Sequence, residues 1–122
     1  MKSILAVLAS LMLFSATVYV TAVPEVINIP ESGVCVVEFN ASFNSGNSVD
    51  WLDNLSDCKG KRIDIATDPS MQKEHKIVVV PTIIVFNDGE EIKRFQANIM
   101  MKMEAKLDDV QTIVDETVME SF

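Results

Sequence analysis

Cysteine and histidine carry much of the covalent and metal chemistry of proteins, and this chain has little of either. Its two cysteines, Cys35 and Cys58, lie too far apart for a Cys-x-x-Cys pair, and its single histidine, His75, cannot complete a zinc site with them. Three interpretations of the cysteines remain: one structural disulfide formed in an oxidising compartment, two buried free thiols, or a reactive thiol at Cys58. We expect no metal and no cofactor, and we expect His75 to be a solvated helix residue.

An acidic residue inside an apolar segment is the second feature that could do chemistry. Glu38 interrupts the apolar run at 34–39, and a run of that length predicts a strand that is covered on both faces in the middle of a sheet. A carboxyl group buried there without a partner would have a raised pKa and would destabilise the fold. We therefore expect a cation such as Lys61, or water, to reach Glu38.

A polar loop follows this strand. Residues 40–48 are mostly Asn, Ser, Ala and Gly, and several of these residue types are typical of helix caps. Apolar residues within 49–55 then recur at helical spacing. We predict a helix that begins near Asn47 or Ser48 and ends before Gly60.

The rest of the chain alternates strands and helices. Pro81 divides the apolar stretch at 77–86, so a strand should begin just after it, because proline cannot donate a hydrogen bond to a sheet. The other predicted elements are an edge strand at 25–29, a strand at 61–66, a helix at 68–76, a hairpin turn at 87–90 with a second arm at 91–96, and an amphipathic helix at about 101–119. Met100, Met101 and Met103 are expected to fill the gap beneath that last helix, and the alternative is an adaptable apolar patch.

The first residues differ in composition from the rest. Residues 1–22 carry Lys2 as their only charged side chain, and the apolar segment at 4–23 is long enough to span a bilayer. We predict a signal peptide or a signal anchor at 1–22, followed by a single domain at 23–122. The protein would then be secreted, periplasmic or lumenal, or it would be anchored to a membrane by this segment alone.

The charge of the chain excludes one class of partner. The formal net charge is −8, and every acidic residue lies after residue 22. Such a surface repels phosphate backbones, and no cluster of lysines and arginines opposes that field. We therefore expect no nucleic-acid binding.

Three segments of the sequence resemble the thioredoxin superfamily. They are VVEFNASF at 36–43, IVVVPTIIVF at 77–86 and NDGE at 87–90. In that superfamily the first segment is a central strand that leads into Trp-Cys-Gly-Pro-Cys at a helix start, and the second holds a cis-proline facing this motif. The resemblance implies an α/β fold: a thioredoxin-like three-layer sandwich whose mixed sheet has four to five strands and flanking helices. The apolar segment at 4–23 adds an N-terminal hydrophobic helix before this domain.

The resemblance also identifies a degenerate active-site loop. It places Asn44 and Asn47 where the two cysteines of the motif would stand, with Ser45 and Gly46 between them and Phe43 in front. Disulfide exchange needs a thiolate whose pKa is lowered at a helix N-terminus, and a second thiol to resolve the mixed disulfide. An amide supplies neither, so we expect no dithiol activity. The two asparagines are either helix caps or binding groups at an exposed tip.

Pro81 is the centre of a second candidate site. The resemblance implies a cis peptide bond before Pro81 and backbone pairing between Val80 and an extended substrate, so Val80, Pro81 and Thr82 are candidate residues of a peptide-binding groove. The alternative is that Pro81 only preserves the fold. Glu38 matches a buried acid that moves protons for the second cysteine in active members, and here it has no such cysteine to serve.

Three functions follow from these interpretations. The favoured one is a redox-inactive module that binds a peptide or protein partner and is exported or tethered to a membrane. The first alternative is an enzyme related to thiol-disulfide oxidoreductases that acts through Cys58 or Cys35. The second is a structural component of a membrane-associated assembly. An enzyme is the least favoured of the three because the dithiol of the superfamily is absent.

Overall fold

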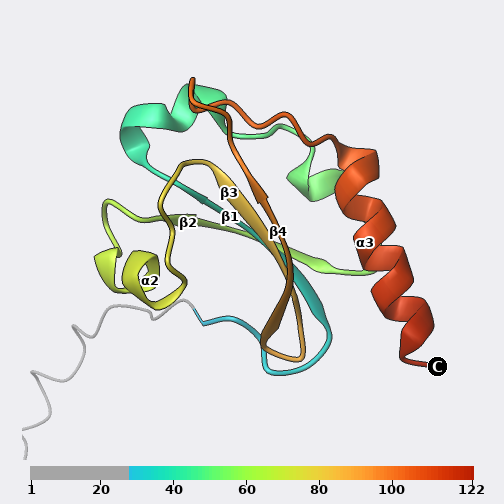
Figure 1. Ribbon diagram of the computed structural model, residues 1–122. Helices are drawn as coiled ribbons and strands as arrows, with labels where there is room; N and C mark the ends of the chain where they lie inside the picture. The colour runs from blue at the N-terminus through green and yellow to red at the C-terminus, as the bar shows by residue number, and fades with distance from the viewer. Residues whose placement is uncertain (1–27) are drawn as a thin grey trace, which may run out of the picture.

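A four-stranded mixed sheet with strand order β2-β1-β3-β4 forms the middle of the domain (Figure 1). The computed structural model describes residues 28–122, so the predicted signal peptide or anchor lies outside the described residues. The strands are β1 (Val34–Asn40), β2 (Lys59–Asp64), β3 (Thr82–Asn87) and β4 (Glu90–Gln96). The helices are η2 (Ser42–Asn47) and η3 (Leu52–Asn54), which are short 3-10 helices, and the α-helices α2 (Pro69–Glu74) and α3 (Leu107–Glu120).

The two middle strands occupy the centre because their sequences are apolar throughout. β1 pairs in parallel with β2 and antiparallel with β3, and almost every residue of β1 and β3 is buried. Strands that are covered on both faces need such continuous apolar runs. β4, at one edge, is mostly exposed, and its charged residues discourage pairing with a further strand.

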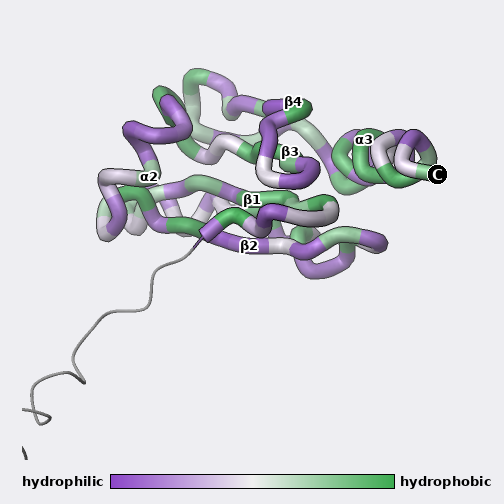
Figure 2. Tube along the Cα trace, turned by 90° about the horizontal axis from the view of Figure 1, so that it is seen from below, coloured by the Kyte–Doolittle hydropathy of each residue, from purple (hydrophilic) through white to green (hydrophobic). Residues whose placement is uncertain are grey.

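Each face of the sheet has its own apolar core. Alternate residues of β1 point to opposite faces, so Val37 packs in one cluster with Met71 of α2. Val36 packs in the other cluster with Val114 of α3. The helices α2 and α3 accordingly lie on opposite sides of the sheet (Figures 1 and 2), which makes the domain the three-layer arrangement expected from its sequence.

The helix predicted between Asn47 and Gly60 is wrong. Ser48 has extended backbone angles, and only the single turn η3 follows it. The backbone N–H of Val49 donates to Oε2 of Glu38 at 2.8 Å instead of to a helical carbonyl. Val49 and Leu52 are nevertheless buried in the core on the α3 side, so the apolar spacing predicted burial correctly and the secondary structure incorrectly.

The other boundaries follow the sequence more closely. The hairpin is confirmed, with Asp88 and Gly89 in the turn at φ values of 52° and 85°. Asp68 caps α2 by accepting from the N–H of Met71 at 3.4 Å. In the described part of the predicted edge strand, Asn28 and Ile29 belong to no strand. The last helix begins later than predicted, so the chain between β4 and α3 is an irregular loop.

Within residues 28–122, no helix has the length and apolar character needed to cross a bilayer.

Candidate functional site

A network of amide side chains lies at the end of β1, where the resemblance placed the degenerate loop. Asn44, in η2, is buried, and its Nδ2 donates to Oδ1 of Asn40 at 3.1 Å, to the carbonyl of Met101 at 3.1 Å and to the carbonyl of Val80 at 3.4 Å. Its Oδ1 accepts from Nδ2 of Asn47 at 2.8 Å. The side chain of Asn44 therefore links three segments that are distant in sequence.

This geometry corrects both expectations for Asn44. It does not cap a helix, because η2 has no side-chain cap and no α-helix follows it before β2. It is not a binding group at an exposed tip, because only 5% of its surface is accessible. Ser45 and Gly46 are exposed and Asn47 is half-buried, so the tip of the loop is exposed although its central amide is not.

The segment before Pro81 faces Asn44. The Val80–Pro81 peptide bond is cis, and Oγ1 of Thr82 donates to the carbonyl of Val79 at 2.7 Å. The N–H groups of 78–80 have no hydrogen-bond partner among the described residues. This segment consequently offers unpaired backbone N–H groups.

An apolar groove of about 430 Å³ runs beside these donors. Its walls come from the loop after β1, from 77–80, from the loop after β4 and from a fourth part made of Ile65, Ala66 and Gln72. The apolar lining residues of the first three walls include Ala41, Phe43, Val78, Val80, Ile99 and Met101. Charged residues make up 23% of the chain, yet none lines this groove. The groove is thus suited to an uncharged, apolar occupant.

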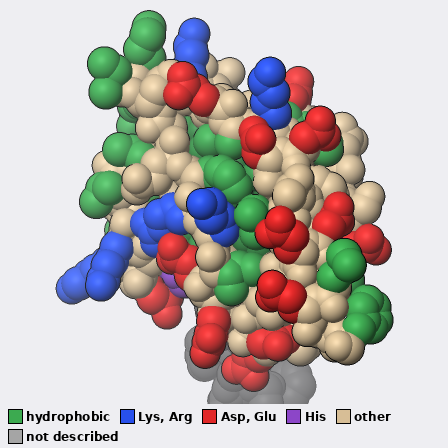
Figure 3. Space-filling view, turned by 45° about the vertical axis from the view of Figure 1, so that its right-hand side comes forward, with side chains coloured by type: hydrophobic (Ala, Val, Ile, Leu, Met, Phe, Trp, Pro, Cys, Tyr) green, Lys and Arg blue, Asp and Glu red, His purple; other side chains and the backbone are tan. Residues whose placement is uncertain are grey.

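Three of the groove residues are far more exposed than apolar side chains usually are. Phe43 is 76% exposed, Val78 is 78% exposed and Ile99 is fully exposed. In Figure 3 hydrophobic side chains gather at the upper left edge of the molecule, and this is the end at which the loops after β1 and β4 lie in Figure 1. A cluster of exposed apolar side chains around a groove is typical of an interaction site.

The loop after β4 is the part of the site that sequence reasoning missed. Oδ1 of Asn98 accepts from the N–H groups of Met100 at 2.9 Å and Lys102 at 3.1 Å, and the N–H of Asn98 donates to the carbonyl of Lys102 at 3.0 Å. These bonds close the loop and direct Ile99 outward. The apolar run from Ile99 onward, which lies between a hairpin and a helix, was the signal that could have identified it.

The methionines divide between the two interpretations. Met103 packs against the core under α3, as expected for all three. Met100 is 67% exposed, however, and Met101 lines the groove. The expectation that these two fill the core is wrong, and they belong to the apolar patch that was the alternative.

The cationic partner of Glu38 is Arg62, not Lys61. Nε of Arg62 donates to Oε1 of Glu38 at 3.1 Å, and the backbone N–H of Val49 donates to the other carboxylate oxygen, Oε2. Lys61 instead donates to the carbonyl of Asn28. Burial raises the pKa of Glu38, while the Val49 N–H and the Arg62 guanidinium act to lower it. Strand alternation could have identified Arg62, because it lies directly beside Glu38 in the register of β1 and β2.

The two cysteines are free thiols on opposite sides of the sheet. Cys35 is buried in the core beneath α2, and Cys58 packs against the core beneath α3. The structural disulfide, one of the three interpretations of the sequence, is therefore not formed. Burial raises the pKa of Cys35. Burial, with smaller contributions from Cys35 and Asp57, raises the pKa of Cys58 to about 11. Neither thiol has the lowered pKa of a reactive cysteine.

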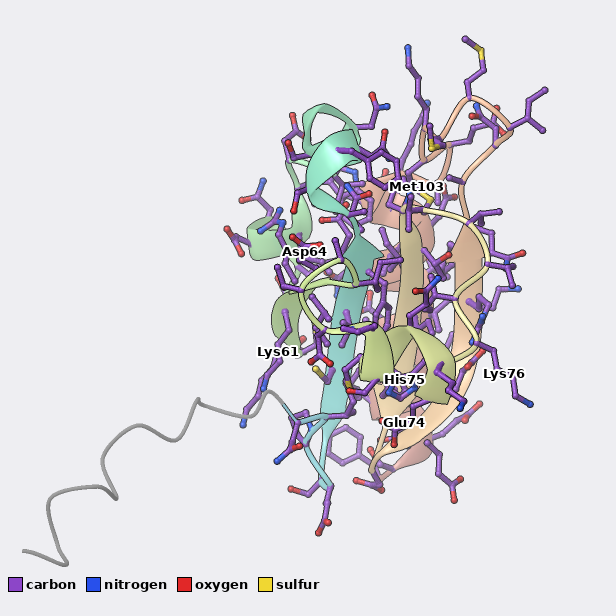
Figure 4. The ribbon with its side chains drawn as sticks, turned by 90° about the vertical axis from the view of Figure 1, so that its left-hand side faces the viewer. Lys61, Asp64, Glu74, His75, Lys76 and Met103 are labelled. Atoms are coloured by element: carbon purple, nitrogen blue, oxygen red, sulfur yellow. The ribbon has the colours of Figure 1, made fainter. Side chains whose placement is uncertain are left out.

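His75 does not line the groove, and Figure 4 shows it between Glu74 and Lys76 at the end of α2. Its ring packs against Phe39 and Phe86 with centroid distances of 5.4 and 5.3 Å, and only 15% of its side chain is exposed. The expectation of a solvated residue is therefore wrong, because this side of the helix end packs on the sheet. Within residues 28–122, no group of three His, Cys, Asp or Glu side chains is arranged to hold a metal ion.

Comparison with known proteins defines the class of fold. No family model matches the chain, and no curated protein sequence matches it. The described residues form a thioredoxin-like domain, because solved thioredoxins share its architecture.

Three solved structures illustrate this similarity. The reduced Schistosoma mansoni thioredoxin pre-protein gives a TM-score of 0.57 at 18% identity, over 70% of this chain and 80% of that one. A mutant thioredoxin from Halobacterium salinarum gives 0.56 at 18% identity, over 70% and 74%. A chain from a structural study of the thiol resolving mechanism of yeast mitochondrial 1-Cys peroxiredoxin gives 0.53 at 15% identity, over 79% and 96%. Identities this low establish the fold alone.

Proposed function

We propose that this domain is a redox-inactive binding module that holds an extended, apolar segment of a peptide or protein partner in the groove beside Pro81. The observation that carries the proposal is the unpaired N–H groups at 78–80, a segment that lines a groove without charged side chains. An extended segment that lies beside 78–80 would accept main-chain hydrogen bonds from those of the N–H groups that face it, and the groove would select its side chains.

The exposed side chains around the groove support an apolar partner. Phe43, Val78 and Ile99 are all largely in contact with water in the free domain. Burying apolar surface contributes about 25 cal/mol per Å², so a partner that covers these side chains gains its affinity mainly from them. The main-chain hydrogen bonds fix its direction and register.

The surroundings of the groove favour a particular kind of segment. The lining carries no charge to pair with an ionised side chain, and burying an unpaired charge is costly. The chain as a whole has a net charge of −8, which attracts basic residues outside the groove. The favoured partner is therefore an uncharged, β-branched or aliphatic stretch with basic flanks.

Two features argue against an oxidoreductase that uses a single thiol. Cys58 and Cys35 both have raised pKa values, so little thiolate is present near neutral pH. Neither lines the groove.

Export or membrane anchoring through residues 4–23, which lie outside the described residues, is a further part of the proposal. The intact mass of the native protein would report whether these residues are retained.

The test is a binding titration with a defined probe. The probe is a capped, fluorescein-labelled peptide of alternating valine and threonine with a lysine pair at each end, and the readout is fluorescence anisotropy. Val78→Asp should raise the Kd at least about tenfold, because it places a charge in the groove. Ile92→Asp is the matched control, because Ile92 is an exposed apolar residue of β4 that does not line the groove. An unmeasurable affinity of the unmodified protein, or equal effects of the two variants, would overturn the proposal.

A further inference from the structure

The side-chain amide of Asn44 contacts three of the segments that wall the groove. It reaches the end of β1 through Oδ1 of Asn40, the segment before Pro81 through the carbonyl of Val80, and the loop after β4 through the carbonyl of Met101. Phe43, Val78, Ile99 and other groove residues belong to these same segments. One buried side chain thus links these three walls, whereas the fourth wall, at Ile65, Ala66 and Gln72, makes no hydrogen bond with it.

The three acceptors depend on Asn44. Among the described residues, no other donor contacts Oδ1 of Asn40 or the carbonyls of Val80 and Met101. A buried acceptor without a donor is costly. Without the amide, these oxygens would have to turn toward water, and the walls that carry them would have to separate.

An amide is the short side chain that fits this position. Its two hydrogens are shared among the three acceptors, of which the carbonyl of Val80 at 3.4 Å is the farthest, while its oxygen accepts from Nδ2 of Asn47. A thiol or a hydroxyl has a single hydrogen, and a carboxylate has none at neutral pH. The backbone of the residue is also fixed, because its N–H donates to the carbonyl of Ala41 at 2.8 Å.

We propose that Asn44 is a positioning residue, whose amide holds the walls of the groove at the separation that a bound segment requires. This inference rests on the proposed function for its consequence, which is affinity for the segment. Its other consequence is the position of the loop after β4 in the free protein, and this consequence depends only on the hydrogen bonds of Asn44. A preformed groove binds more tightly because less ordering is needed on binding.

The experiment compares two substitutions that differ from Asn44 mainly in their hydrogen bonding. Asn44→Leu has a similar size and no donors, and should raise the Kd for the valine-threonine probe at least about tenfold. Asn44→Asp has the same shape but presents a carboxylate to three oxygen acceptors. It should bind poorly at about pH 8 and recover affinity as the pH falls to about 5, because the protonated carboxyl becomes a donor. The unmodified protein should show no such recovery.

Two controls separate positioning from a general loss of stability. Val110→Ala removes buried methyl groups under α3, so it destabilises the domain away from the groove and should leave the Kd within about twofold. In the free protein, the methyl NMR signal of Met101 should shift in Asn44→Leu and remain unchanged in Val110→Ala. The signal of Met119, at the far end of α3, should not move in Asn44→Leu.

The outcomes distinguish the two proposals. If the unmodified protein does not bind the probe but the Met101 signal shifts in Asn44→Leu, the proposed function fails and the positioning role stands. If the protein binds the probe and Asn44→Leu binds it equally well, the positioning role is overturned. The role is also overturned if Val110→Ala weakens binding as much as Asn44→Leu, or if Asn44→Asp shows the same pH dependence as the unmodified protein.

Discussion

Replacement of Arg62 by methionine should expose the cost of the buried carboxylate that it accompanies. Nε of Arg62 donates to Oε1 of Glu38 at 3.1 Å, and Nη2 donates to the carbonyl of Val49 at 2.7 Å. A third contact, from Nη1 to Asp53 at 3.9 Å, involves an exposed carboxylate and contributes little. Methionine retains much of the apolar stem of arginine but none of its donors.

The size of the effect follows from the unequal exposure of the two partners. The side chain of Glu38 is completely buried, whereas that of Arg62 is 42% exposed. A hydrogen bond to a charged group contributes about 1.5–3 kcal/mol, and water can replace part of that at the exposed arginine but not at the buried carboxylate. We therefore expect Arg62→Met to lower the free energy of unfolding by about 2 kcal/mol near pH 7.

The loss should depend on pH in a definite direction. Burial raises the pKa of Glu38 above its ordinary value of 4.5, and removing Arg62 should raise it further. A group whose pKa is higher in the folded state contributes stability that is fully present below the unfolded pKa and is lost as the pH rises through the folded pKa. The variant should consequently lose stability more steeply than the unmodified protein between about pH 5 and about pH 7.

The assay is urea denaturation followed by the fluorescence of Trp51, the only tryptophan of the chain. The loss of about 2 kcal/mol near pH 7 should fall to less than about half of that near pH 5, where Glu38 is increasingly protonated. In a Glu38→Gln background, Arg62→Met should cost under about 1 kcal/mol at both pH values. An equal loss at both pH values, or an undiminished loss in the Glu38→Gln background, would refute the assignment of Arg62 as the partner of the buried carboxylate.

Two other predictions concern the thiols and the hairpin turn. The pKa of Cys58 is raised to about 11, so a thiol reagent at about pH 8 should modify it about a hundredfold more slowly than free cysteine. Cys35 should react only after the protein unfolds. Rapid labelling of either cysteine in the folded protein would contradict this prediction. Gly89→Ala should lower the free energy of unfolding by about 1 kcal/mol, because φ is 85° and a Cβ there would meet nothing closer than 3.8 Å. Gly46→Ala, in open space without a positive φ, is the control and should be neutral in the same urea titration.

The fold could be predicted from the sequence wherever one local signal decides the structure. The hairpin follows from Asn-Asp-Gly between two runs of alternating residues, and β1 follows from an apolar run too long for an edge strand. The region after Asn47 could not be predicted in this way, because a carboxylate from another strand determines it. Glu38 takes the N–H of Val49, and no pattern within 49–55 contains that information.

The candidate site was predictable in its location but not in its chemistry. The resemblance placed the loop at 43–47 near Pro81, and the contact between Asn44 and the carbonyl of Val80 agrees with that placement. The burial of Asn44 depends on the loop after β4, whose carbonyl at Met101 it contacts. Such contacts join residues that are far apart in the chain, so a sequence read segment by segment does not reveal them.

The side chain at position 44 and the absence of an α-helix after η2 are connected in this domain. A thiolate at position 44 would need the N-terminus of an α-helix beside it to lower its pKa, but η2 ends in the extended residue Ser48. The side chain at position 44 is instead turned inward against the carbonyls of Val80 and Met101, where a negative charge would be repelled. The same geometry that makes this position unfavourable for a thiolate makes it favourable for a neutral donor of two hydrogen bonds. This geometry fits the positioning role proposed for Asn44, in which a neutral amide rather than a thiolate faces these carbonyls.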